Sequence, residues 1–519
     1  MHTTFVIKFY MILLFFIAGG LIHLFLFFLH RTSGVLSSHL FHKLIPVLWS
    51  GLFLIFISMW LIQHRSENRV RVACFPLITS DAGLDIAITD GLNNCLKKAN
   101  PREILNYPLD WSYDAIAKDS VSDVSYLLSY GKRIGLHLLI TEQVRSQFGT
   151  GCVVDLTCYD LEEGRCVSRI RDSLHFDQTE VFFGNVLRRV MDFSSHDFDS
   201  IPSPMLPSVT VWREYSSARY YQLNDDLDSA EITFKSAIAV DSTQPILLKG
   251  LASVLLEKGL RLKTDGEYVE DTYHKTAGLL HRVLKIDSTD SEAYRLLGRL
   301  HIQKERWNRA EEALQKSLQW EKDDPFLYFN LTRLHTSRYR EMGYRNRESL
   351  LKHALNLNPA LERAWIALGE DYYFRNRPDR AEKTYTKLLK IHPNSLDGLL
   401  ALGKLYVFRN DVLNIIRVYE KVLKIKPDYA DVYYNLGIAY YNDKKEEKAI
   451  RFFERAIELN NHVDSHLYLG IIHAKRGDRE QAIEFLRKRI RLRRGDNDPF
   501  AEEARRNLYE LLYNREQTS

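Results

Sequence analysis

Five glycines recur at a nearly constant interval in the second half of the chain. Gly298, Gly369, Gly403, Gly437 and Gly470 are separated by 71, 34, 34 and 33 residues. The longest interval corresponds to two units of 34 residues with a short insertion. A period of roughly 20 to 50 residues is typical of proteins built from stacked structural repeats. The spacing therefore predicts a row of similar units in this half of the chain, rather than one globular core.

Each unit carries the pattern of two helices that pack against each other. After Gly437, Tyr440 follows at three residues, Ala449 at twelve, Phe453 at sixteen and Ala456 at nineteen. Small residues let two helices approach closely, while aromatic rings fill the space between successive pairs. Successive units are separated by Pro359, Pro393 and Pro427. Because one pair cannot bury its apolar face alone, the pairs are expected to stack.

This pattern resembles the tetratricopeptide repeat, a unit of two antiparallel helices. The resemblance implies an all-α solenoid, or superhelix, of about eight helix pairs at residues 211–498, with a capping helix and tail at 499–519. The first helices of such solenoids line a concave surface that binds peptides or other proteins. The Lys/Asn set that clamps chaperone carboxyl termini is not recognisable in this sequence. We therefore expect a protein or peptide ligand of another kind.

The same resemblance places a partner-binding groove three residues before and one residue after each glycine or its equivalent. The candidates at these offsets are Arg295, Arg299, Arg333, Ile366, Leu400, Tyr434 and Leu467. The three arginines would form a basic wall in the early units, and the other four an apolar floor in the later units. A partner with an acidic end and an apolar end would complement both.

Two long apolar runs lie close to the start of the chain. In residues 9–29 only His23 interrupts the run, and residues 44–62 contain no ionisable side chain. Each run has about the 20 residues that cross a bilayer as a helix. We predict that residues 1–64 form a membrane hairpin of two transmembrane helices.

The basic residues around these runs predict the orientation of the hairpin. Lysines and arginines at the chain start and directly after the second run outnumber those in the connecting loop. This bias favours both ends on the inner side of the membrane. The soluble part is then cytoplasmic, at a bacterial inner membrane, and a periplasmic position is the rival prediction.

Residues 70–195 alternate between strand and helix patterns and predict a small α/β sandwich, followed by a linker at 196–210. The segments "VRVACF", "LHLLITEQVR" and "CVVDLTCYDLEEGRCVSRIRDSLHF" indicate strands, the last of them a hairpin, and "DVSYLLSYGKRIG" indicates a helix that ends at Gly135. The strand ending at Pro76, the helix with Asp90 and the hairpin "YDLEEGR" resemble the TolB-type amino-terminal domain. That resemblance implies a fold and no activity, since neither a cyclase domain nor a winged-helix segment is present.

The sequence carries no pattern for catalysis, a metal or a cofactor. The cysteines are Cys74, Cys95, Cys152, Cys158 and Cys166, and they lack metal-ligand or CxxC spacing. We expect buried thiols, while a Cys158–Cys166 pair across the hairpin stays open. The cluster of Asp81, Asp85 and Asp90 suits helix capping better than a metal or acid/base site. With no phosphate loop, nucleophile elbow or HExxH motif, we expect no cofactor, no metal and no enzymatic activity.

Charge gives one further candidate surface. With 71 basic and 67 acidic residues the chain is nearly neutral, so its bulk charge does not indicate nucleic acid. The segment "KRGDREQAIEFLRKRIRLRR" near the end nevertheless contains nine basic residues. This segment either contacts anionic lipid or nucleic acid, or forms the solvated rim of a terminal helix.

These patterns favour a membrane-anchored scaffold or adaptor that binds proteins. One alternative is a signalling or regulatory subunit whose α/β domain senses a ligand or partner. The second alternative is an unrecognised enzyme.

Overall fold

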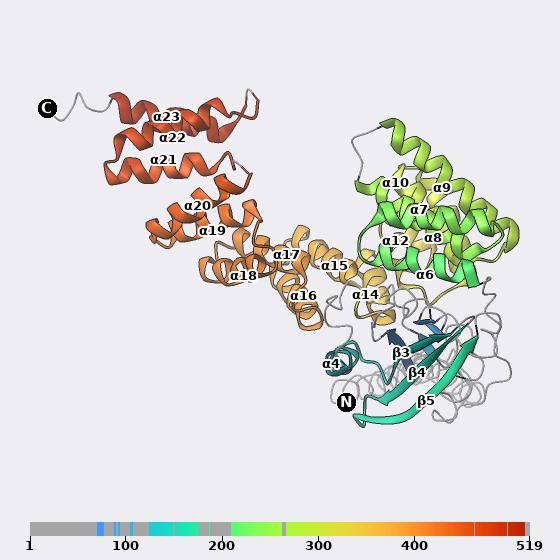
Figure 1. Ribbon diagram of the computed structural model, residues 1–519. Coiled ribbons are helices and arrows are strands. Elements are labelled where there is room, and N and C mark those ends of the chain that lie inside the picture. Colours follow the sequence, from blue (N-terminus) through green and yellow to red (C-terminus); the bar gives the residue numbers. More distant parts are fainter. Residues whose placement is uncertain are drawn as a thin grey trace, which may run out of the picture.

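A computed structural model gives the fold of the chain (Figure 1). It describes residues 70–76, 88–89, 92–93, 104–106, 124–148, 151–175, 186, 209–261, 266–460, 462–495 and 497–513. The predicted membrane hairpin, the aspartate cluster and most of the predicted linker lie outside these residues. Within the described part of the chain, no helix has both the length and the apolar character needed to cross a bilayer.

The amino-terminal part contains one mixed sheet, which confirms the predicted strands and their order along the chain. Its strands are β1 (Val70–Pro76), β2 (Ile104–Asn106), β3 (Leu138–Phe148), β4 (Gly151–Asp160) and β5 (Arg165–His175). They lie in the order β2-β1-β3-β4-β5, with β1 parallel to both of its neighbours and β3, β4 and β5 antiparallel. Together with helix α4 (Val124–Ile134), these strands form what we call the sheet domain.

Apolar alternation places the two faces of the sheet in different environments. Cys74, Ile140 and Val154 point into a core that they share with Val211 and Tyr215 of helix α6. On the opposite face, α4 covers the sheet and ends at Gly135, whose φ of +74° is the left-handed conformation that glycine adopts without strain. The first helix of the solenoid therefore completes the core of the sheet domain.

The cysteines of the sheet domain are free thiols wherever they are described. Cys74, Cys152 and Cys158 are buried, as predicted, whereas Cys166 is exposed. A register shift after Cys158 sets Cys158 opposite Ser168 and Cys166 opposite Tyr159. Because the two thiols are not paired residues in the ladder, the hairpin does not hold a Cys158–Cys166 bridge in this structure.

The remainder of the chain is a row of antiparallel helix pairs, which confirms the predicted repeat solenoid. The pairs are α6 (Val209–Leu223) with α7 (Leu227–Val240), α8 (Pro245–Arg261) with α9 (Gly266–Ile286), α10 (Ser291–Gln303) with α11 (Trp307–Trp320), α12 (Pro325–Leu331) with α14 (Arg347–Leu357), α15 (Glu362–Phe374) with α16 (Pro378–Ile391), α17 (Leu396–Phe408) with α18 (Val412–Ile425), α19 (Ala430–Asn442) with α20 (Glu446–Asn460), and α21 (Ser465–Arg476) with α22 (Arg479–Arg491). A short helix α13 (Thr336–Glu341) interrupts the fourth pair, and α23 (Pro499–Tyr513) follows the last pair.

The recurring glycines lie where the two helices of a pair cross. A Cβ atom on Gly437 would lie only 2.6 Å from Cε1 of Phe453, sixteen residues later. Gly369 and Gly403 face Tyr385 and Tyr419 in the same way. The ring of the second helix thus occupies the notch that the missing side chain leaves, which explains why these positions require glycine.

A second recurrent feature is the turn between the two helices of a pair. The residue seven positions after each of the five glycines has a positive φ, between +54° and +85°. These residues are Glu305, Asn376, Asn410, Lys444 and Gly477. At four of the five turns a residue with a side chain adopts the left-handed conformation, so the sequence gives little sign of this constraint.

The fourth pair, formed by α12, α13 and α14, departs from this pattern, and we call it the interrupted unit. Thr332 stands at the glycine position, 34 residues after Gly298, and Glu348 stands at the position of the ring. Helix α12 has only seven residues and ends at Thr332, after which the chain makes α13 before it returns in α14. The hydroxyl of Tyr339 lies 2.7 Å from the carbonyl oxygens of both Thr332 and Leu334 and fixes this detour.

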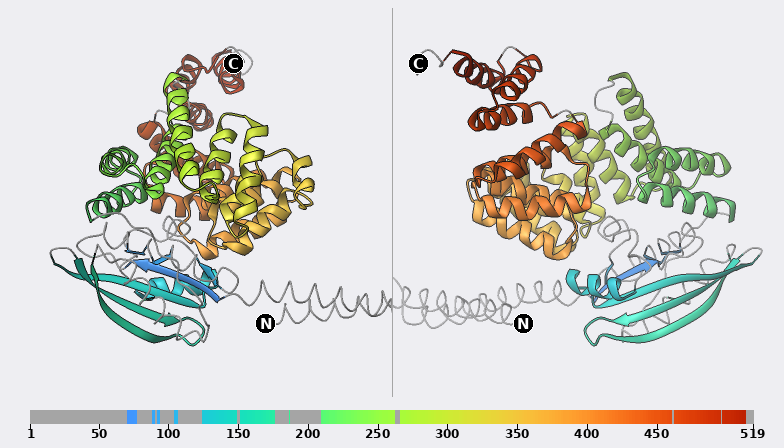
Figure 2. Two further views of the ribbon diagram at one scale, coloured as in Figure 1. Left: turned by 90° about the vertical axis from the view of Figure 1, so that its right-hand side faces the viewer. Right: turned by 60° about the vertical axis from the view of Figure 1, so that its left-hand side comes forward.

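The solenoid curves around the sheet domain and touches it a second time (Figure 2). Leu127 and Tyr130 of α4 share a core cluster with Ala360, which lies in the link between α14 and α15. His392, directly after α16, lies against the Tyr130 ring, with the two ring centres 6.1 Å apart. The sheet domain therefore contacts both the first pair and the region around the fifth pair.

Candidate partner-binding site

The predicted groove begins on α10 with two arginines that have different environments. Arg295 Nε lies 2.6 Å from Asp324 Oδ2, and its Nη2 lies 3.2 Å from Glu292 Oε1. Asp324 also accepts hydrogen bonds from the backbone N–H groups of Phe326 and Leu327 at the start of α12. Arg295 is therefore a structural residue that joins two successive units, and its charge is largely neutralised.

Arg299, one helical turn later, has no such neutralisation. Its Nη2 atom is buried and has no hydrogen-bond partner among the described residues. Burial lowers the pKa of its guanidinium group to about 10, the charges of Arg363 and Arg295 add to this lowering, and Glu257 opposes it. The site around Arg299 therefore carries an excess of positive charge in a poorly solvated position, which an anionic group would stabilise.

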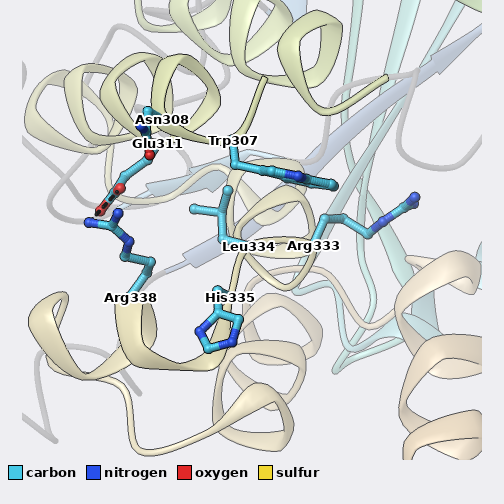
Figure 3. Close-up of a pocket in the computed structure, with 7 residues that line it drawn as sticks. All are labelled: Trp307, Asn308, Glu311, Arg333, Leu334, His335 and Arg338. Atoms are coloured by element: carbon cyan, nitrogen blue, oxygen red, sulfur yellow. Dashed lines mark ion pairs between the residues drawn. The ribbon is translucent and has the colours of Figure 1, made fainter. Parts of the chain in front are cut away.

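Arg333 does not continue this basic wall along a regular helix. It follows the end of α12 and is exposed, because the interruption at Thr332 redirects the chain. Its side chain lines a cavity of about 370 Å³ together with Trp307, Asn308, Glu311, Leu334, His335 and Arg338 (Figure 3). The sequence prediction treated this unit as regular, and the missing glycine and the five arginines between residues 333 and 347 are the signals that would have revealed the difference.

The predicted apolar floor is partly accessible. Ile366 and Leu400 are half-buried, and Leu400 packs against the core of the solenoid. The Tyr434 ring stacks on His462 with a centroid distance of 4.2 Å, and burial raises the pKa of its hydroxyl. These three side chains occupy the first helices of the fifth, sixth and seventh pairs, as the repeat frame predicts.

Leu467 is a correction to the predicted floor. It is only 1% exposed and packs in a cluster with Leu486 and Ala504. Ala504 belongs to α23, so the final helix covers the last pair and takes Leu467 into the core. The repeat frame could not reveal this burial because a terminal helix has no counterpart in the inner units.

The basic segment near the end of the chain also contains an internal residue. Arg489 is 1% exposed, and its Nη2 lies 2.7 and 2.9 Å from the two carboxylate oxygens of Asp498 and 2.8 Å from Oδ1 of Asp464. Asp498 in turn accepts hydrogen bonds from the backbone N–H groups of Phe500 and Ala501 at the start of α23. This arginine thus fixes the final helix and is unavailable to lipid or nucleic acid.

A search for metal ligands adds no further site. Among the residues that the structure describes, no three His, Cys, Asp or Glu side chains are grouped so as to hold a metal ion.

Comparisons with known proteins are consistent with this repeat architecture. Models described as tetratricopeptide repeat match residues 270–333, 362–405, 431–460 and 465–500, and one described as TPR repeat matches residues 416–444. No curated protein matches the chain.

Similar solved structures include three of MamA. One crystal structure of MamA has 21% sequence identity and a TM-score of 0.27, and covers 30% of this chain and 92% of its own. A second has 20% identity and a TM-score of 0.29, and covers 33% of this chain and 92% of its own. The third, described as the MamA RS-1 ArsTM double mutant, has 24% identity and a TM-score of 0.29, with 33% and 94% covered. The family matches and the helix pairs together establish that this chain contains tetratricopeptide repeats between residues 270 and 500.

Proposed function

We propose that this protein is a membrane-anchored scaffold or adaptor that binds a protein partner along the concave face of its repeats. The tetratricopeptide repeats support a role in protein interaction. The first helices of the pairs offer Arg299 at one end of the groove and Ile366, Leu400 and Tyr434 further along. A partner segment with a carboxylate near Arg299 and apolar side chains beyond it would complement both regions.

The observation that carries this proposal is the environment of Arg299. Its Nη2 atom is buried without a hydrogen-bond partner from the described chain, and Arg295 and Arg363 add positive charge. A buried charged group without a partner is costly, so a carboxylate that enters the groove gains a charge-assisted hydrogen bond and relieves that cost. Arg295, by contrast, already has Asp324 and Glu292 as partners.

Site-specific photo-crosslinking tests the groove directly. A photoreactive residue at Lys404, which is exposed on the first helix of its pair, should capture the partner in cells. The same residue at Lys421, exposed on the second helix of that pair, is the matched control and should capture little. Equal capture at both positions would show that the concave face is not the binding surface.

Charge reversal tests the role of Arg299 in the same assay. Arg299→Glu should reduce capture at Lys404 by about tenfold or more, since reversal of a desolvated charge removes one attraction and adds one repulsion. Arg417→Glu, an exposed change of the same kind on α18, should leave capture unchanged. Undiminished capture by a folded Arg299→Glu variant would contradict the proposal.

The membrane anchor is a separate part of the proposal. Its support is the pair of apolar runs at residues 9–29 and 44–62 and the basic residues that flank them. A reporter fused after Ser519 should be active only in its cytoplasmic form. Activity of a periplasmic reporter at the same position would place the repeats on the other side of the membrane.

A further inference from the structure

The cavity beside the interrupted unit has the features of a second recognition site. Trp307 and Glu311 reach it from α11, and Leu334, His335 and Arg338 reach it from the link after α12 and from α13. Figure 3 shows Arg338 and Glu311 at one end of the cavity, Trp307 and Arg333 towards the other, and Leu334 between them. Its volume of about 370 Å³ accommodates one or two amino-acid side chains.

The two ends of this cavity differ in charge. At one end Arg338 Nη1 lies 2.9 Å from Glu311 Oε2, so these charges neutralise each other. At the other end Arg333 is exposed and forms no ion pair with any described residue. Trp307 is 47% exposed although it is a large aromatic residue, so much of its indole ring is open to a ligand.

The chain around the cavity strengthens this positive charge. Residues 333–347 contain five arginines and a single glutamate, and that glutamate, Glu341, lies 3.8 Å from Arg338. Arg340 and Arg345 are exposed, and the described residues provide neither with an acidic partner within ion-pair distance. The interrupted unit therefore presents an uncompensated basic surface next to an exposed aromatic ring.

These features fit an acidic peptide better than a membrane or a nucleic acid. Lipid headgroups and phosphate backbones bind to open basic surfaces, whereas this site is a concave cavity with a carboxylate, Glu311, in its wall. An apolar side chain can enter against Trp307 and Leu334, while a neighbouring carboxylate reaches Arg333.

We infer that the cavity of the interrupted unit binds an extended peptide segment of a partner protein, in which an aspartate or glutamate lies next to a large apolar residue. Arg333 pairs with the carboxylate and Trp307 packs against the apolar side chain. This site rests on the proposed role in protein binding, but it is separate from Arg299 and from the first helices of the later pairs. It gives the protein two contacts with a partner, which raises the effective affinity of each.

An oriented peptide library tests this inference with the full-length protein in detergent. Peptides with one fixed Asp or Glu and degenerate flanking positions form the acidic set, and peptides with a fixed Lys form the control set. The protein should retain the acidic set and select Leu, Ile, Phe or Trp beside the fixed residue. No selection from the acidic set, or equal retention of the Lys set, would overturn the inference.

Substitutions then locate the selected peptide. Arg333→Glu and Trp307→Ala should each weaken its binding about tenfold, while Arg333→Lys and Trp307→Phe should retain part of the affinity and also report on folding. Arg299→Glu should leave peptide binding unchanged. Peptide binding that depends on Arg299 but not on Arg333 would overturn this inference and support the groove alone.

Competition separates the two other sources of negative charge. A vesicle containing phosphatidylglycerol and a single-stranded oligonucleotide should each fail to displace the bound peptide at 150 mM salt. Displacement by either would overturn the assignment to a peptide. Crosslinking at Lys404 reports on the groove in a separate assay, so loss of the cavity site and failure of the proposed function have different signatures.

Discussion

The fifth pair and the interrupted unit are neighbours along the solenoid, but their helices pack differently. In the fifth pair, Gly369 on α15 receives the ring of Tyr385 from α16, and α15 continues for thirteen residues. In the interrupted unit, Thr332 and Glu348 occupy the corresponding positions, and the first helix stops after seven residues. Where the notch and the ring are both absent, the pair does not close in the regular way.

This difference shows how a repeat protein acquires a local function. A regular pair needs its glycine and ring for stability, so these positions are not free to carry chemistry. The interrupted unit has lost that constraint, and its Glu348 instead accepts a hydrogen bond from the Tyr372 hydroxyl at 2.8 Å. The cavity with Trp307 and Arg333 lies where the chain departs from the pattern.

The largest effect is expected where the notch of the fifth pair is filled. Gly369→Ala would place a methyl group inside the Tyr385 ring position, and overpacking should outweigh the gain in helix propensity and lower the unfolding free energy by roughly 2 kcal/mol. Urea unfolding followed by circular dichroism measures this change. Gly278→Ala on α9 is the control, because a Cβ there has no described atom within 4 Å, and it should be neutral or stabilising. Equal losses in both variants would break the comparison.

A smaller effect is expected at the detour of the interrupted unit. Tyr339→Phe removes the hydroxyl that lies near the Thr332 and Leu334 carbonyl groups, which leaves buried acceptors unsatisfied and should cost about 1 to 2 kcal/mol. Hydrogen exchange in residues 332–341 should accelerate, while exchange in α19 and α20 should not change. Uniform acceleration along the solenoid would mean that the interrupted unit is not an independent element.

The contact with the sheet domain should make one regular unit sensitive to pH. His392 is buried against Tyr130 near Arg133, and Lys426, at the corresponding position of the next unit, is exposed. Burial lowers the pKa of His392 to about 4 from its usual 6.5. The unfolded chain thus binds the proton more readily, so the stability of this contact is greatest above pH 6.5 and falls as the pH drops towards 4, by about 1 kcal/mol per pH unit.

Thermal unfolding between pH 7 and pH 4 checks the size of this effect. His392→Gln should flatten the pH dependence, since it removes the titrating group. His281→Gln changes an exposed histidine and should leave the profile of the parent protein unchanged. An unaltered profile in the His392→Gln variant would assign the pH dependence to other buried histidines.

The smallest effect is a gain in stability at the turn of the seventh pair. Lys444 has a φ of +59°, which is strained for a residue with a side chain. Lys444→Gly should raise the unfolding free energy by about 0.5 to 1 kcal/mol, because relief of that strain exceeds the entropy that glycine loses on folding. Lys448→Gly, in the interior of α20, should have the opposite sign. Differential scanning calorimetry can resolve both shifts.

The sequence predicted the regular pairs well because their signal is written in residue types. Only glycine fits under Tyr385 or Phe453, so the 34-residue spacing reports the packing directly. The strands of the sheet domain were also predictable, since β3, β4 and β5 alternate clearly and Gly135 ends α4. In each case one local rule decides the structure.

The candidate site was less predictable because it depends on contacts between distant segments. Arg295 looked like a free groove arginine, but Asp324 of the next unit neutralises it. Leu467 fits the frame of the groove, yet α23 buries it, and Trp307 drew no notice because it lies outside the groove offsets. Offsets within one unit cannot reveal what a neighbouring unit or a terminal helix adds.

The interrupted unit also has a mechanical consequence. Meshed pairs such as α15–α16 and α19–α20 resist shear as a stiff spring does, because each ring is seated in the opposite helix. The interrupted unit lacks that seat, and load applied between the two ends of the solenoid should concentrate strain in α12 to α14. In a pulling experiment, the first extension should occur at this joint, and the arms on either side should keep their curvature.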